Sequence, residues 1–124
     1  MKNFLYLFVI YFLSLQNLKA SAHVVGTTIS SNITIDQNWI NANSGPWAIS
    51  GNNITVTFGE NLVINDINQY FEIIGTNVTI NGGNYVVTID GVSNFNGLVK
   101  ASNSNALSAE IKNIGVITLN STAL

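Results

Sequence analysis

The residues of this sequence that could do chemistry are few, and the clearest pair is Asp66 and Asp90, which occupy equivalent places in two consecutive repeats of the chain. If those repeats place them on neighbouring β-strands, their carboxylates lie about 5 Å apart. Two carboxylates at that distance can share a Ca²⁺ ion or act as an acid and a nucleophile. Because unshielded like charges repel, calcium is the favoured functional interpretation. The structural alternative is that each Asp ends a strand and accepts hydrogen bonds from turn amides.

Trp39 and Trp47 flank a polar loop at 41–46 and are the candidates for stacking against sugar rings. Tryptophan also covers the end of a hydrophobic core, which is the alternative interpretation for both residues. His23 is the single histidine of the chain, and it has no recognisable serine or cysteine triad around it. We therefore name no catalytic residue and no cofactor, and we predict that the protein is not an enzyme.

Four Asn-x-Ser/Thr sequons begin at Asn32, Asn53, Asn77 and Asn120, and each can accept an N-glycan in a secretory pathway. The first three open β-type segments at equivalent places, so their Asn and Thr side chains also suit stacking between neighbouring strands. Asn120 lies near the C-terminus and is the best acceptor of the four. The sequence thus predicts a glycoprotein with Asn120 as the first candidate.

The composition is apolar and almost uncharged, since 47% of residues are hydrophobic and 8% are charged, which argues against disorder. The absence of Cys excludes disulfides, cysteine zinc sites and thiol catalysis. Without Lys2 and Lys19 the net charge becomes −4, and no Arg is present. Nucleic acid and anionic membrane surfaces, which require clustered basic side chains, are therefore not expected as partners.

Residues 1–22 have the pattern of a signal peptide. Lys2 supplies a basic start, an apolar run covers Phe4–Leu15, and small residues occupy Ala20-Ser21-Ala22. We predict cleavage after Ala22, because the apolar run is shorter than the roughly 20 residues that a membrane span needs. The mature chain from His23 has no second such run, so we expect it to leave the membrane and to be secreted or associated with a cell or virion surface.

The chain repeats itself with a period of about 24 residues, within the range that solenoid and propeller repeats use. At this shift Asn53–Val56 matches Asn77–Ile80. A weaker copy at Asn32–Ile35 precedes the first at a slightly shorter spacing, and a degenerate copy runs from 110 to 119. The same shift extends the match to Leu62-Val63 with Val86-Val87, Asp66 with Asp90, Phe71 with Phe95, and Ile74 with Leu98.

Each repeat contains three short β-type segments separated by Asn, Gly or Asp, and no helical periodicity follows the signal segment. Three strands in about 24 residues fit one coil of a parallel β-helix. The sequence predicts an all-β fold of about four coils over residues 32–124, with 23–31 as an N-terminal cap. The last coil, ending at Leu124, has no polar cap. We therefore expect end-to-end self-association through it, or a truncated member of a longer design.

The segments at 55–62, 69–75 and 79–91 resemble the right-handed parallel β-helix superfamily of pectate-lyase-like architecture. More narrowly, they look like repeats in large exported β-helix proteins of giant viruses. That resemblance implies an exported surface protein with no known activity. The superfamily also contains polysaccharide lyases and hydrolases, whose lyase sites usually combine Arg or Lys with several acids. This chain has no Arg, and its mature lysines, Lys100 and Lys112, lie outside the best repeats.

The function that we predict is therefore a structural or adhesive surface module, glycosylated and with glycans or another surface molecule as its partner. The alternative is the remnant of a polysaccharide lyase or hydrolase.

Overall fold

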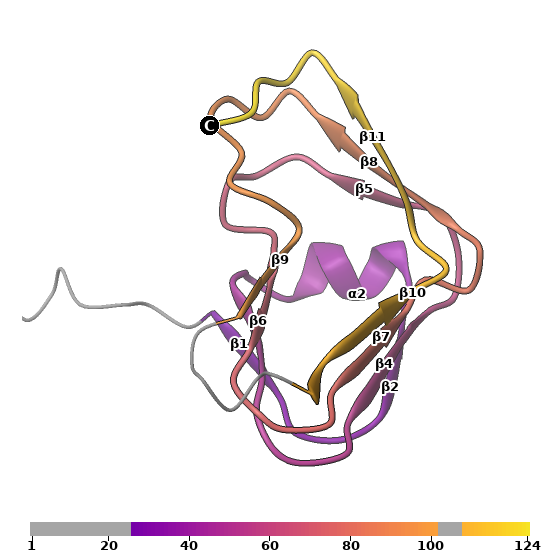
Figure 1. The fold of residues 1–124 in the computed structure, drawn as a ribbon. Helices are drawn as coiled ribbons and strands as arrows, with labels where there is room; N and C mark the ends of the chain where they lie inside the picture. Colours follow the sequence, from indigo (N-terminus) through magenta and orange to yellow (C-terminus); the bar gives the residue numbers. More distant parts are fainter. Residues whose placement is uncertain (1–25, 102–107) are drawn as a thin grey trace, which may run out of the picture.

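The computed structural model describes residues 26–101 and 108–124, and it shows a parallel β-solenoid of about three turns (Figure 1). The predicted signal peptide lies outside the described residues. Three sheets enclose a triangular interior, and every strand pairing within them is parallel. The predicted all-β, parallel β-helix fold is thus confirmed.

The strands of each sheet follow one another from the first turn to the last. Sheet 1 contains β1 (Thr27–Ile29), β3 (Trp47–Ile49), β6 (Phe71–Ile73) and β9 (Val99–Ala101). Sheet 2 contains β2 (Ile33–Ile35), β4 (Thr55–Phe58), β7 (Thr79–Asn81) and β10 (Glu110–Lys112). Sheet 3 contains β5 (Leu62–Ile64), β8 (Val86–Asp90) and β11 (Gly115–Leu119). Sheet 3 has one strand fewer because the first level carries a helix, α2 (Gln37–Ala42), in its place.

The core consists of columns of inward-facing side chains that stack from level to level. In sheet 2 Val56 pairs with Ile80, as the repeat predicts, and both side chains are fully buried. Ile111 continues this column in β10. Because successive strand residues alternate between faces, the Thr55 and Thr79 side chains point outward, and they lie side by side at the same position along their strands. The period found in the sequence is therefore the strand register of β4 with β7, and β3 pairs with β6 at the same shift.

Asparagines turn several corners between the sheets. All six non-glycine residues with positive φ among the described residues are Asn, including Asn53 at 61° and Asn77 at 52°. The Asn77 Nδ2 donates to the Asn53 Oδ1 at 3.1 Å, which confirms the predicted stacking of these two residues. Between the next two levels, the Asn113 Nδ2 donates to the Asn81 Oδ1 at 3.2 Å. The corner amides thus join successive levels through their side chains.

Sheet 3 departs from the repeat period. Leu62 pairs with Val87, one position beyond Val86, which is the partner that the repeat predicted. The turn from β7 to β8, which contains Asn84 at a φ of 66°, is longer than the turn from β4 to β5. A one-residue slip exchanges the two faces of a strand. Val87 is accordingly buried, whereas Val63, which was matched to it, is 42% exposed.

Sheet 1 departs further, because Phe71 pairs with Val99 and not with Phe95. The loop from β8 to β9 is longer than the loop from β5 to β6. Phe95 instead forms an isolated parallel bridge with Ala123. The earliest copy was also displaced, since Ile33 pairs with Val56 and not with Ile54. That displacement by two positions left the inward and outward faces unchanged.

Helix α2 was not predicted, because its single short segment is too brief for a helical period to show. The Asp36 Oδ1 caps its start by accepting from the Trp39 N–H at 2.8 Å. Gln37 then seals the edge of sheet 3: its side-chain oxygen accepts from the Val63 N–H at 2.7 Å, and its Nε2 donates to the Val63 carbonyl at 3.1 Å. The carboxamide thereby takes the place of a neighbouring strand.

The first turn is closed by this helix. Ile40 of α2 is buried in the core cluster, and Figure 1 shows α2 across the interior that the three sheets surround. Residues 23–31 were expected to form the cap, but of these Thr27–Ile29 form β1 within sheet 1. Nothing in the described ranges forms an apolar helix of the length that crossing a bilayer requires.

Candidate functional site

The two aspartates that were candidates for calcium occupy separate turns. The register of β5 and β8 aligns Asp90 with residue 65, one position before Asp66. The Asp66 Oδ1 accepts from the Asn68 N–H at 2.8 Å, and the Asp90 Oδ1 accepts weakly from the Asn120 Nδ2 at 3.5 Å. Across the described residues, no group of three or more His, Asp or Glu side chains could hold a metal ion. The contact of Asp66 matches the structural alternative, in which Asp accepts from an amide of its own turn, whereas the contact of Asp90 reaches the next level.

The two tryptophans pack into the first turn. Trp47 is completely buried, its ring centre lies 5.0 Å from that of Phe71, and its Nε1 donates to the Asn43 carbonyl at 2.9 Å. Trp39, which is half-buried, lies 5.7 Å from Trp47 between ring centres. Trp47 therefore has no free ring face for a sugar and is a core residue, as the alternative interpretation held.

All four sequon asparagines are exposed. The Asn32 Oδ1 accepts from the Thr55 N–H at 2.8 Å, and Asn53 and Asn77 form the ladder described above. Within the described residues, the Asn120 side chain has only the long contact with Asp90. The structure thus leaves Asn120 the least engaged of the four amides.

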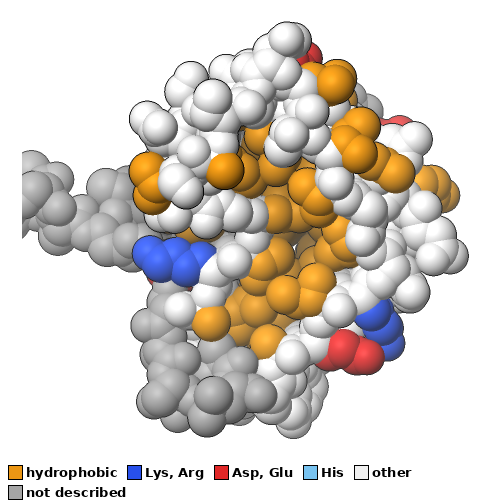
Figure 2. Space-filling view, turned by 45° about the horizontal axis from the view of Figure 1, so that its top comes forward, with side chains coloured by type: hydrophobic (Ala, Val, Ile, Leu, Met, Phe, Trp, Pro, Cys, Tyr) orange, Lys and Arg blue, Asp and Glu red, His pale blue; other side chains and the backbone are white. Residues whose placement is uncertain are grey.

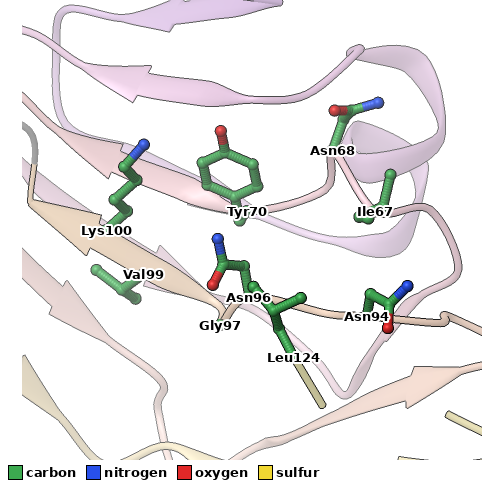
Figure 3. A pocket seen from close by; sticks show the side chains of 9 residues that line it. All are labelled: Ile67, Asn68, Tyr70, Asn94, Asn96, Gly97, Val99, Lys100 and Leu124. Carbon is green, nitrogen blue, oxygen red and sulfur yellow. The ribbon is translucent and has the colours of Figure 1, made fainter. Parts of the chain in front are cut away.

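Several hollows on the described surface contain polar side chains, and two of them lie among the loops between strands. One, of about 390 Å³, lies beside α2 and is lined mainly by amides together with Asp66. The other, of about 490 Å³, lies between the loop before β6 and the loop before β9 (Figure 3). Tyr70 and Lys100 stand along it, with Asn96 and Leu124 nearby. Neither hollow brings together the two carboxylates that glycoside hydrolysis requires.

An apolar surface is exposed at the end of the solenoid that β9, β10 and β11 form, which we call the open end. Its inward-facing side chains continue the core columns, but no described strand covers them. Ile111 is 51% exposed and Val116 is 48% exposed, whereas their partners one level below, Ile80 and Val87, are fully buried. Figure 2 shows the apolar side chains gathered in a hollow with a mostly polar rim.

The edges of these strands are open as well. An edge strand presents backbone N–H and C=O groups to any strand that can approach, and proteins usually protect such edges. The opposite end of sheet 3 is protected in this way, because Gln37 occupies both backbone groups of Val63. The two ends of the solenoid are therefore different: the first is covered by α2, and the last presents open strands and exposed core.

Charges at the open end are confined to its outer rim. Lys100 extends from β9, while Glu110 and Lys112 project from β10 and form an exposed ion pair of 3.2 Å. β11 carries no charged residue. The uncapped last coil was predicted from the sequence. That Glu110 and Lys112 project side by side from its edge could be recognised only once the register of β10 was known.

No family model, no curated protein and no solved structure matches this chain.

Proposed function

We propose that this protein is an exported structural surface protein, in which a β-solenoid serves as a rigid block and self-associates through its open end. The observation that carries this proposal is the unsatisfied end of all three sheets on one side of the molecule, with Ile111 and Val116 half-exposed above a buried core. Apolar side chains in that position gain about 25 cal/mol for each Å² that a partner covers. A second copy of the chain supplies a surface of the same composition.

Self-association is tested with Ile111→Asp in the full chain as the producing cell releases it. Each joined pair of variant molecules would bury two unpaired carboxylates, at a cost of several kcal/mol each. We expect the association constant from sedimentation equilibrium to fall at least about a hundredfold. Val63→Asp is the matched control, because Val63 is similarly exposed at 42% but faces outward from β5.

Circular dichroism and thermal melting of both variants check that the β-solenoid survives the substitutions. If the unmodified protein stays monomeric at every accessible concentration, the proposed function is wrong. It is equally wrong if Ile111→Asp associates as strongly as Val63→Asp.

Export and glycosylation are part of the same proposal and are read from one experiment. Produced through a eukaryotic secretory pathway, the chain should appear in the medium with His23 as its first residue. Its mass should exceed that of the polypeptide by at least one N-glycan, and Asn120→Gln should remove that glycan because Asn120 is exposed and least engaged. Retention of residues 1–22, or an unchanged mass in Asn120→Gln, would contradict the respective part.

A further inference from the structure

We propose that two copies of this protein join open end to open end about a two-fold axis that passes through Ile111, so that β10 pairs with itself in antiparallel orientation. This inference rests on the proposed function, in which the open end self-associates, and it adds the register and the symmetry. The product is a closed dimer with an α2-covered end on each outer side.

The backbone of β10 sets the register. The Glu110 N–H donates to the Val78 carbonyl at 2.9 Å, and the Lys112 carbonyl accepts from the Gly82 N–H at 2.9 Å, so both residues face β7. Successive residues of a strand direct their backbone groups to opposite sides, and Ile111 therefore directs its N–H and C=O to the open edge. In an antiparallel ladder, two residues that face each other in this way exchange both hydrogen bonds. Ile111 opposite Ile111 of the second copy satisfies that geometry.

The charges of β10 complement each other in this register. With Ile111 opposite its own copy, Glu110 lies opposite Lys112 of the second copy, and Lys112 lies opposite Glu110 of the second copy. Cross-strand pairs of opposite charge stabilise a sheet, whereas like charges destabilise it. The other edges lack this property, because β9 carries a single charged residue, Lys100, and β11 carries none. Charge complementarity thus selects β10 as the strand on the axis.

The shape of the open end agrees with the same axis. A solenoid rises by one strand spacing, about 4.8 Å, in each turn. Since β9, β10 and β11 follow one another around the last turn, each stands about 1.6 Å, a third of that spacing, above the one before. A two-fold axis through the middle strand places recessed β9 against projecting β11 of the second copy.

The covered end determines that the assembly closes. Head-to-tail stacking would bring β11 against α2, which stands where sheet 3 has no strand in the first level, so β11 would find no strand to pair with. An interface in which both copies use the same surface closes at two molecules, whereas head-to-tail contacts grow into rings or fibres. The structure therefore favours a dimer over a filament.

The test uses two charge variants of the full chain as released by the producing cell. Glu110→Lys leaves two positive side chains on β10, and Lys112→Glu leaves two negative ones. At low ionic strength each variant alone should dimerise at least about tenfold more weakly than the unmodified protein, because two attractive pairs become repulsive. An equimolar mixture of the two variants should form a heterodimer with nearly the original affinity. Lys100→Glu, which would face uncharged β11, is the matched control and should change the affinity little.

Mixing separates this geometry from a role of the ion pair within one chain, because both variants lose that internal pair and mixing cannot restore it. The doubly exchanged variant, Glu110→Lys with Lys112→Glu, should dimerise like the unmodified protein. Failure of the mixture to rescue dimerisation, or growth beyond two molecules with rising concentration, overturns the proposed geometry and leaves the proposed function standing. A protein that remains monomeric overturns both.

Discussion

Gly75→Ala should lower the free energy of unfolding by about 3 kcal/mol or more. A Cβ built on Gly75 would overlap the Gly51 carbonyl oxygen, which belongs to the backbone of the preceding level. The Gly75 N–H also donates to the Ile49 carbonyl at 3.0 Å, so the corner can move away only by losing that bond. Urea unfolding followed by far-UV circular dichroism measures the change.

Gly59→Ala is the control for this substitution. Its added Cβ would meet the Thr34 Cγ2 at 3.1 Å, and a methyl group at the end of a side chain can give way. We expect a loss below about 1 kcal/mol, in the usual range of a surface substitution. Equal losses at the two glycines would show that the corner near Gly51 is not packed as closely as the structure indicates.

Trp47→Ala should cost about 3–5 kcal/mol of stability, the range for truncating a large buried aromatic side chain. Trp47 is fully buried against Phe71, and its removal leaves a cavity beneath α2. The Asn43 carbonyl also loses its donor. Chemical denaturation gives the change in free energy, and Trp47→Phe, which retains most of the ring, should lose substantially less.

Trp39→Ala separates packing from ligand binding. Trp39 is half-buried and contacts Trp47, so its truncation should destabilise the fold less than truncation of Trp47. If Trp47→Ala melted like the unmodified protein, the assignment of Trp47 to the core would be wrong. Binding of Trp47→Ala to a panel of glycans would then be the property to measure.

The fold was predictable because the pairing of β4 with β7 in sheet 2 keeps the period of the sequence repeat. Thr55 and Thr79 are partners on neighbouring strands, and the shift that aligns them in the sequence is the one that pairs these strands. The later registers of sheets 1 and 3 were not predictable from that shift, although β3 and β6 of sheet 1 keep it. A turn with Asn84 at positive φ adds a residue, and a longer loop before Val99 adds more, so the matches of Val63 and Phe71 failed.

The candidate surface was predictable only in outline. The lack of a polar cap after the last coil indicated an exposed end, and Ile111 and Val116 are indeed exposed there. The self-complementary arrangement of Glu110 and Lys112 depends on which backbone groups of β10 face β7, and that information is absent from a sequence pattern. Helix α2 was missed because its six residues are too few to show a helical period, and the contacts of Gln37 with Val63 link positions far apart in the sequence.

The corner asparagines, whose backbone is in the left-handed region, limit which substitutions this sequence can accept. Most L-residues pay roughly 1–2 kcal/mol for that conformation, whereas glycine adopts it freely and asparagine tolerates it. Random substitution at Asn53 or Asn77 is thus filtered more narrowly than at Val63, which is 42% exposed and faces outward, so that most replacements there cost little. The richness in asparagine, which resembles a bias in surface composition, is at these corners a requirement of the backbone.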